Sequence, residues 1–424
     1  MLKQIEGSRA VAEAVAMCRP RVICAYPITP QTHIVEALSA MVKTGELNAE
    51  FLNVESEFAA MSVAIGACAA GARAYTATAS QGLLFMSEAV YNAAGLGLPI
   101  VMTVANRAIG APINIWNDHS DSMSQRDAGW LQLFAETNQE ALDLHIQAFR
   151  IAEEMSIPVM VCMDGFLLTH ASERVDLPSP DQVDAFLPPY VPRQVLDPDD
   201  PVSIGAMVGP EAFTEVRYLA FERMRQALDV IRDVAIGFQA EFGRASGGLI
   251  RPYLTDDAEV VVVALGSVLG TVKDAVDDLR AGGMRVGVLG ITAFRPFPAD
   301  AVREALDGTS RHVVVLERAI APGTSGGIMT ADIRMALASA GLGCRSVQHV
   351  STVVAGLGGR AVTRRSLCAM LTDAADGSLE PLTFLDLDTG LVGRELDRMS
   401  ATRRSGPSAE NMLRDLGITA SRIG

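Results

Sequence analysis

The chain has 424 residues, of which 49% are hydrophobic and 20% are charged, and its formal net charge is −15 at pH 7. This length allows two or three domains with a sizeable buried core. The acidic balance argues against nucleic acid and anionic membranes as partners. The six cysteines include no Cys-x-x-Cys pair, so the sequence indicates neither a zinc site nor an iron–sulfur cluster.

The N-terminal segment and the apolar runs carry no targeting or membrane signal. Met1–Gly7 lacks the apolar core of a signal peptide. No uninterrupted apolar stretch reaches membrane-spanning length. We therefore expect a cytoplasmic protein.

Short apolar runs alternate with longer helical patterns over residues 7–164. The expected strands are Val22–Ala25, Glu50–Val54, Ala74–Ala79, Pro99–Ala105 and Pro158–Met163. The expected helices are Gly7–Met17, Gln31–Val42, Phe58–Ala70 and Leu84–Ala94. Gly66, in the third of these helices, is expected to let a neighbouring backbone approach. Continuous apolar runs separated by helices indicate an α/β fold with a doubly wound parallel sheet covered on both faces.

The stretch Tyr26-Pro27-Ile28-Thr29-Pro30 joins the first of these strands to a helix. Its prolines fix φ and disfavour helical backbone in the preceding residues. The stretch is therefore held extended at the carboxyl end of a strand, where open α/β sheets bind their ligands. Taken alone, the stretch favours a rigid turn that binds no ligand.

Four polar residues follow successive expected strands: Thr29, Glu57, Gln81 and Arg107. They should lie along one edge of the sheet, because the carboxyl ends of parallel strands share an edge. The alternative is that they cap helices, since strand-to-helix turns favour polar residues. Their recurrence in four successive units favours a functional site.

Residues 108–128 form a long polar loop, and loops of this length in compact domains tend to be functional or disordered. Its Trp and Ile residues favour an ordered loop. Asp118, His119 and Asp121 lie in it, but their spacing is not one at which side chains converge on a metal ion. We expect no metal site there.

The chain then becomes rich in Pro and Asp over residues 176–210, which predicts an extended arm. A long helix is expected over Glu211–Phe242. A second, smaller doubly wound unit begins near Arg251. Its expected strands are Glu259–Gly266, Val286–Leu289 and Val313–Leu316, and its expected helices are Thr271–Ala281, Ala299–Leu306 and Thr330–Ala340.

Two further segments of this half have weaker signals. Gly266–Gly270 lacks the full spacing of a nucleotide-binding loop and is interpreted as a strand-to-helix turn. From about Ala374 the chain is expected to be irregular, and Arg403–Gly424 reads as a polar tail or a late interaction helix.

Several stretches together resemble the α subunit of the thiamine-diphosphate-dependent 2-oxoacid:acceptor oxidoreductases, such as pyruvate:ferredoxin oxidoreductase. The resemblance covers roughly residues 5–370 in order. It rests on Tyr26–Pro30, Glu55-Ser56-Glu57, Ser80-Gln81-Gly82, Asn106-Arg107, Ala111–Asp118, Met163–Phe166 with Thr169-His170, Phe294–Pro298 and Gly356–Arg360.

This resemblance implies a domain organisation and roles for three residues. Residues 1–250 would form a pyrimidine-binding domain that includes the 176–210 arm. Residues 251–375 would form a domain similar to the C-terminal domain of transketolase, and residues 376–424 would form an irregular extension. Glu57 would face N1′ of the aminopyrimidine and favour the imino tautomer, whose N4′ removes the C2 proton. Arg107 would bind the substrate carboxylate. Thr29 would contact substrate beside the thiazolium. These three are the candidate catalytic residues.

Departures from the family pattern bear on the substrate. Phe58-Ala59 follows Glu57 where many relatives carry His-Ser, which could reshape the pocket. A relative acting on oxalate would be expected to hold an arginine at Thr29, so oxalate is disfavoured. Pyruvate and an arylglyoxylate such as phenylglyoxylate both stay open.

The resemblance also implies partner subunits. The family's diphosphate and Mg²⁺ half-site uses a Gly-Asp-Gly motif, which is absent from these 424 residues together with any cluster cysteines. A β subunit would bring that half-site, and γ and ferredoxin-like subunits would bring [4Fe–4S] clusters. Coenzyme A would be co-substrate, and ferredoxin or NAD the final acceptor.

Two other functions remain alternatives. One is a transketolase- or decarboxylase-like subunit with non-redox thiamine chemistry, and the other is a non-catalytic assembly subunit. The presence of Thr29, Glu57 and Arg107 together disfavours a scaffold, which needs none of them.

Overall fold

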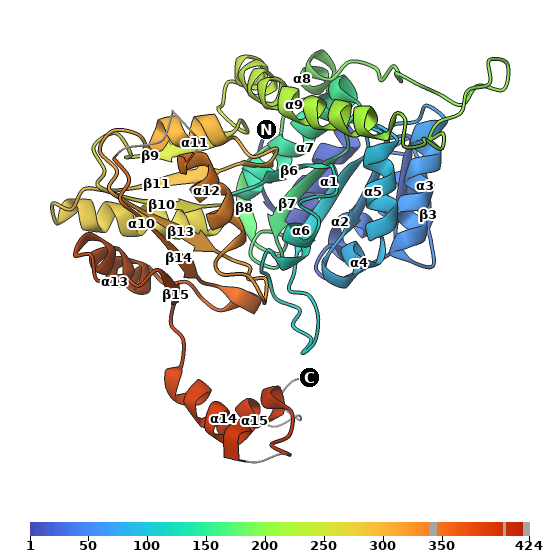
Figure 1. The fold of residues 1–424 in the computed structure, drawn as a ribbon. Coiled ribbons are helices and arrows are strands. Elements are labelled where there is room, and N and C mark those ends of the chain that lie inside the picture. Colours follow the sequence, from blue (N-terminus) through green and yellow to red (C-terminus); the bar gives the residue numbers. More distant parts are fainter. Residues whose placement is uncertain (339–345, 402–403, 419–424) are drawn as a thin grey trace.

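In the computed structural model, which describes residues 1–338, 346–401 and 404–418, the chain forms two parallel-dominated sheets with helices on their faces (Figure 1). The larger sheet has the order β12-β6-β7-β5-β4-β2-β3. Its strands are β2 (Val22–Ala25), β3 (Glu50–Asn53), β4 (Ala74–Thr78), β5 (Val101–Asn106), β6 (Leu131–Phe134), β7 (Val159–Asp164) and β12 (Ala293–Arg295). The expected α/β fold with a parallel sheet is confirmed.

The inner strands of the larger sheet are buried on both faces, as is typical of parallel sheets. Every residue of β4, β5, β6 and β7 is buried, as expected of strands covered on both faces. All neighbouring strands pair in parallel except β12, which runs antiparallel to β6. The chain thus returns from its second half to complete the first sheet. A strand as short as β12 has no sequence pattern that would predict it.

Helices cover both faces of this sheet. They are α1 (Gly7–Met17), α2 (Thr32–Thr44), α3 (Glu57–Ala69), α4 (Ser80–Phe85), α5 (Ser87–Gly95), α6 (Ser120–Ser124), α7 (Asn138–Met155) and α9 (Phe213–Phe242). One apolar cluster joins α1, α2, α7 and α9, and a second joins α3 and α5 with part of the smaller sheet. Gly66 faces open space, since an added Cβ would meet no atom within 4 Å, so the expected close approach there is wrong.

The smaller sheet has the order β15-β14-β13-β10-β11-β9 and is parallel except for β9. Its strands are β9 (Ile250–Tyr253), β10 (Val260–Ala264), β11 (Val286–Ile291), β13 (His312–Glu317), β14 (His349–Val354) and β15 (Leu382–Phe384). Its helices are α10 (Val268–Ala281), α11 (Ala299–Leu306), α12 (Ile328–Ala338) and α13 (Arg364–Ala375). The end of the helix expected over Thr330–Ala340 lies outside the described residues.

A buried carboxylate joins the two sheets. Asp164 ends β7, and its Oδ2 accepts hydrogen bonds from Arg318 Nη1 at 2.8 Å and from the Ser267 amide at 2.9 Å. Its Oδ1 lies 2.7 Å from His119 Nε2. Burial acts to raise the pKa of Asp164, but Arg318 and His119 outweigh it and hold that pKa well below its ordinary value.

The arm expected over residues 176–210 is extended only in part. Its first residue ends β8 (Ser172–Asp176), which pairs antiparallel with β1 (Leu2–Glu6). A short helix, α8 (Pro180–Phe186), follows, and Ser179 and Gln182 form a capping box at its start. Phe186 packs on Phe238 of α9, with ring centroids 5.5 Å apart. The prolines of this segment led us to expect an extended chain. Pro180, however, lies in the first turn of α8, where proline is tolerated.

The expectation that residues 376–424 form an irregular extension is also wrong in part. It contains α14 (Thr389–Ala401) and α15 (Ser408–Asp415), which stand apart from both sheets (Figure 1). Arg398 Nη2 lies 3.1 Å from Asp415 Oδ1, and Asn411 Nδ2 donates to Glu395 at 3.1 Å. Leu396 is exposed. Polar contacts thus contribute to holding this helix pair, and α15 lies within Arg403–Gly424, where a late interaction helix was one of the two expectations.

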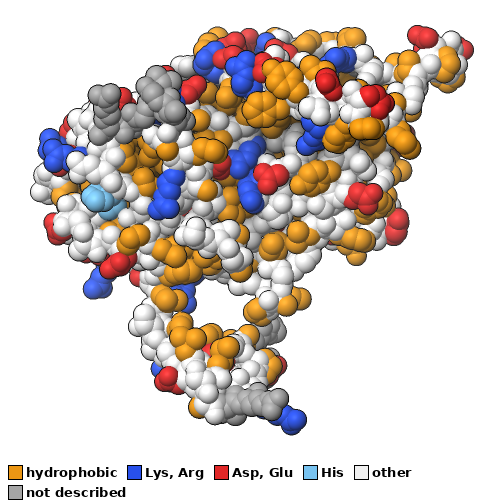
Figure 2. Space-filling model, in the orientation of Figure 1, with side chains coloured by type: hydrophobic (Ala, Val, Ile, Leu, Met, Phe, Trp, Pro, Cys, Tyr) orange, Lys and Arg blue, Asp and Glu red, His pale blue; other side chains and the backbone are white. Residues whose placement is uncertain are grey.

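Apolar side chains are exposed on α9 and the arm, including Met207, Phe213, Tyr218 and Phe221. Figure 2 shows apolar groups gathered on this side of the molecule. Among the described residues, no helix is long and apolar enough to cross a membrane.

Candidate functional site

The four polar residues singled out in the sequence follow four adjacent strands. The strands run in the order β5-β4-β2-β3 and are parallel, so their carboxyl ends share one edge. Arg107 follows β5, Gln81 follows β4, Thr29 follows β2 and Glu57 follows β3. The structure therefore places these residues on neighbouring loops at that edge.

Arg107 and Thr29 are in direct contact. The guanidinium Nη1 of Arg107 donates to the Thr29 carbonyl oxygen at 2.8 Å. Thr29 itself is exposed, while Arg107 is partly buried. Burial lowers the pKa of Arg107, and the neighbouring Asp121 opposes that shift. The Nε of Arg107 is buried and has no hydrogen-bond partner in the described structure.

Glu57 is the first residue of α3 and is 7% exposed. The preceding residue caps the helix, because the Ser56 hydroxyl accepts from the Ala59 amide at 3.1 Å. Among the described residues, none donates a hydrogen bond to the Glu57 carboxylate. Buried carboxylates normally have a partner, so this one is available to a ligand.

Gly82 forms one wall of the space around Glu57. A Cβ added at Gly82 would lie 2.6 Å from Glu57 Oε1 and 2.6 Å from Thr78 Oγ1. The hydroxyl of Thr78 is buried and has no partner in the described part of the chain. The Glu57 carboxylate and the Thr78 hydroxyl thus both contact Gly82, and neither has a hydrogen-bond partner among the described residues.

Asp121 holds the loops after β4 and β5 together. Its Oδ2 accepts from the amides of Ser80 and Arg107, both at 2.9 Å. Its Oδ1 accepts from Asn106 Nδ2 at 2.8 Å and from the Ser122 amide at 2.7 Å. Burial raises the pKa of Asp121 to about 6 even though these hydrogen bonds favour the charged form. Sequence reasoning considered Asp121 only as a metal ligand and missed this role, for which no local pattern gives a signal.

Of the four residues, only Thr29 and Arg107 are joined by a hydrogen bond in the described structure, and Gln81 bonds elsewhere. Its Nε2 donates to the Gly110 carbonyl oxygen at 3.4 Å, which ties it to the loop after β5. The acidic residues and His119 of that loop also diverge. Asp118 accepts from the Ser120 amide at 3.0 Å, and His119 bonds to Asp164.

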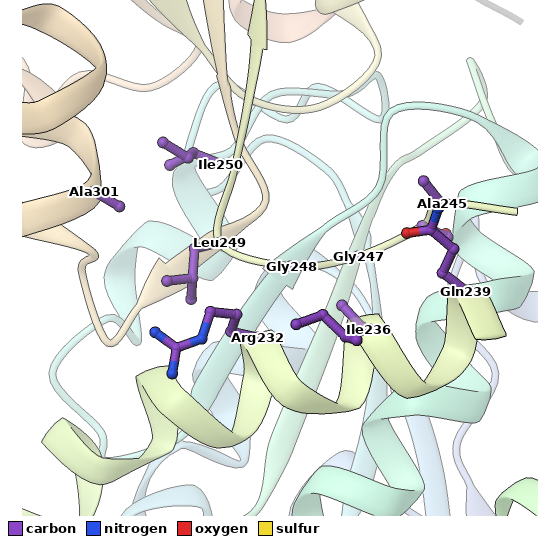
Figure 3. A pocket seen from close by; sticks show the side chains of 11 residues that line it. Arg232, Ile236, Gln239, Ala245, Gly247, Gly248, Leu249, Ile250 and Ala301 are labelled. Atoms are coloured by element: carbon purple, nitrogen blue, oxygen red, sulfur yellow. The ribbon is translucent and has the colours of Figure 1, made fainter.

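Two hollows occur near these elements. A small one of about 180 Å³ is lined by Thr29, Pro30, Thr32, His33, Glu36 and His170. A larger one of about 360 Å³ lies between α9 and the linker before β9, where Arg232, Ile236 and Gln239 face Gly247 and Leu249 (Figure 3). None of Thr29, Glu57 and Arg107 lines the larger hollow, and Arg232 is engaged by Asp229 at 2.9 Å. Of these three residues, the small hollow contains only Thr29.

Comparison with protein families gives two matches that together span most of the chain. Residues 13–235 match the family described as pyruvate flavodoxin/ferredoxin oxidoreductase, thiamine diphosphate-binding. Residues 258–367 match the core domain II of pyruvate:ferredoxin oxidoreductase.

Curated relatives are similar over nearly their whole length. Pyruvate synthase subunit PorA of Methanosarcina barkeri is 47% identical over 92% of this chain and 97% of its own. The same subunit of Pyrococcus furiosus is 43% identical over 92% of this chain and 99% of its own. Ketoisovalerate oxidoreductase subunit VorA of Pyrococcus abyssi is 40% identical over 88% of this chain and 93% of its own.

Two solved structures share the fold. A 2-oxoglutarate:ferredoxin oxidoreductase from Magnetococcus marinus aligns with TM-score 0.68 and 19% identity, covering 88% of this chain and 65% of that chain. A split-gene transketolase aligns with TM-score 0.51 and 14% identity over 88% of this chain and 99% of that one. At these identities the likeness concerns the fold alone.

Proposed function

This chain belongs to the thiamine-diphosphate-binding pyruvate flavodoxin/ferredoxin oxidoreductase family, and from that premise we propose that it is the α subunit of a CoA-acylating 2-oxoacid oxidoreductase acting on pyruvate. Pyruvate is proposed as the substrate because the chain is 43–47% identical to pyruvate synthase subunits over nearly their full length. The VorA relative, at 40%, makes a branched 2-oxoacid the nearest competitor. An arylglyoxylate has no such support.

The residues present fit thiamine diphosphate. The Glu57 carboxylate is buried and without a protein partner, and only a glycine fits beside it at position 82. We propose that the carboxylate accepts a hydrogen bond from the aminopyrimidine ring of the cofactor, since no protein donor in the described structure competes for it. When bound, the cofactor supplies the nucleophilic carbon that attacks the 2-oxo group and the electron sink for loss of CO₂. In this proposal the Glu57 carboxylate accepts a hydrogen bond at N1′ of the aminopyrimidine and so favours its imino tautomer.

Arg107 and Thr29 are proposed to hold the substrate. The guanidinium of Arg107, a side chain that is only partly buried, is proposed to give a charge-assisted hydrogen bond to the substrate carboxylate. Its Nη1 is fixed by the Thr29 carbonyl oxygen, so the guanidinium is oriented before substrate binds. The exposed Thr29 hydroxyl is then available to the 2-oxo oxygen.

The finer assembly is likewise a proposal. Relatives are named as subunits, and this sequence has neither a Gly-Asp-Gly motif nor a Cys-x-x-Cys pair. We propose a β subunit with the diphosphate and Mg²⁺ half-site, γ and cluster-bearing subunits, coenzyme A as co-substrate and ferredoxin as acceptor. The domain limits 1–250, 251–375 and 376–424, and a cytoplasmic location, belong to the same proposal.

The test is CoA-dependent dye reduction by the natively purified complex, with pyruvate, 3-methyl-2-oxobutanoate and phenylglyoxylate compared side by side. The proposal expects the highest kcat/KM with pyruvate and no reduction without coenzyme A. A higher kcat/KM with either of the other acids would overturn the assignment of pyruvate as the substrate. Release of an aldehyde without dye reduction would favour the non-redox alternative.

A further inference from the structure

Three potential metal ligands meet beside Thr29. They are Glu6 at the end of β1, His33 in the first turn of α2, and His170 shortly after β7. One ligand atom from each lies within 4.8 Å of the other two. His33 and His170 also line the small hollow that contains Thr29. The cluster joins segments that are far apart in the sequence.

The imidazole rings are held in place by their surroundings. His170 lies between His33 and Phe166, with ring centroids 4.5 Å and 4.8 Å away. Its Nδ1 is 2.7 Å from the Thr169 hydroxyl, and His33 Nδ1 is 2.7 Å from Glu6 Oε1. Because Glu6 Oε1 lies at His33 Nδ1, the two can share an ion only if His33 binds through Nδ1, with the ion in place of the hydrogen-bonded proton. His170, whose Nδ1 is held by the Thr169 hydroxyl, keeps its Nε2 lone pair for the same ion. A hydrogen-bond partner on the other ring nitrogen is the usual setting of a metal-binding histidine.

The surroundings of the two rings suit a metal ion. Neutral imidazole is the form that binds metals, and the carboxylates of Glu6 and Glu36 nearby supply negative charge.

We propose that Glu6, His33 and His170 form a binding site for a divalent transition-metal ion such as Zn²⁺ or Cu²⁺. Two imidazoles and one carboxylate match the ligand preference of these ions, whereas Mg²⁺ and Ca²⁺ prefer oxygen ligands alone. The site is therefore chemically distinct from the Mg²⁺ that accompanies a diphosphate. Its ligands are none of the residues to which we assign catalysis, although Thr29 lines the same hollow as the two histidines.

The test measures Zn²⁺ bound to the purified, chelator-treated complex by equilibrium dialysis and atomic emission. The informative variant is the double substitution His33→Ala with His170→Ala, which should remove one Zn²⁺ per chain. The matched control is His349→Ala, since His349 is also exposed while His119, His145 and His312 are buried. It should bind as much Zn²⁺ as the unmodified complex. Glu6→Gln should weaken binding by about tenfold.

A spectroscopic readout guards against a variant that loses its fold. With Cu²⁺, the electron paramagnetic resonance spectrum of the unmodified complex should show coupling to two imidazole nitrogens, and His33→Gln or His170→Gln should each leave one. Unfolding midpoints measured with chelator should match in all variants. Equal Zn²⁺ in the double variant and the unmodified complex, or identical Cu²⁺ spectra, would overturn the site and leave a surface His–Glu hydrogen bond.

Discussion

Replacing Gly82 by alanine tests whether the position of the Glu57 carboxylate controls the reaction. The new Cβ would lie 2.6 Å from Glu57 Oε1, and normal contact needs about 3.5 Å. The carboxylate must therefore move by about 1 Å. A displacement of that size at a reacting group costs about 100-fold in rate. We expect kcat of the assembled complex to fall by about that factor.

The same substitution should leave the chain folded. Alanine is favoured over glycine in a helix by about 1 kcal/mol. Overpacking around Glu57 and Thr78 costs about 1–3 kcal/mol. The free energy of unfolding should therefore fall by at most about 2 kcal/mol, a small loss beside the fall in rate.

The assay combines kcat with 2-oxoacid and coenzyme A with a thermal unfolding curve. Gly66→Ala is the matched control, because it adds a methyl group to the helix that begins with Glu57 but meets no atom within 4 Å. It should keep full turnover and gain about 0.5–1 kcal/mol of stability. A folded Gly82→Ala complex with unchanged kcat would refute the reasoning.

Four further predictions concern the same site. Glu57→Gln should keep the fold but lower turnover by orders of magnitude; near-normal activity would remove its cofactor role. Arg107→Ala should mainly raise KM for the 2-oxoacid by about 10–100-fold through the lost charge-assisted bond; an unchanged KM would remove it from the substrate site. Burial raises the pKa of Asp121 to about 6, so its contribution to stability is complete below about pH 4 and is lost as the pH rises through 6. Asp121→Asn should abolish that part of the pH dependence of the unfolding free energy, and an unchanged slope between pH 4 and 6 would contradict it. The chain purified alone should bind thiamine diphosphate poorly by calorimetry; tight binding would contradict a shared site.

The elements that sequence reasoning located have a clear local pattern. α1 and β2 have the bounds expected of them, because a small-residue helix and a short apolar strand are flanked by turn residues. By contrast α7 was not predicted, and polar residues such as Asn138, Asp143 and His145 are buried in it together with the apolar ones. A helix buried on all sides loses the two-faced pattern by which helices are recognised.

The site divides in the same way. The contact between Thr29 and Arg107 followed from the rule that parallel strands end at one edge. The Gly82 wall and the Asp121 hydrogen bonds depend on how loops of different strands pack together. The His33–His170 pair joins two helix and loop positions with no common spacing. Contacts of this kind are set by tertiary packing, which a single sequence does not record.

Unpartnered polar atoms at the sheet edge indicate that the site is built for a ligand. Thr78 Oγ1, Asn106 Oδ1 and Arg107 Nε are buried without partners in the described structure, and they lie at the ends of the adjacent strands β4 and β5. Each such atom costs about 1–3 kcal/mol unless it is paired. Packing alone would select against three of them in one place. A ligand that pairs any of them regains that free energy on binding, so each such pairing would add to the affinity of the site.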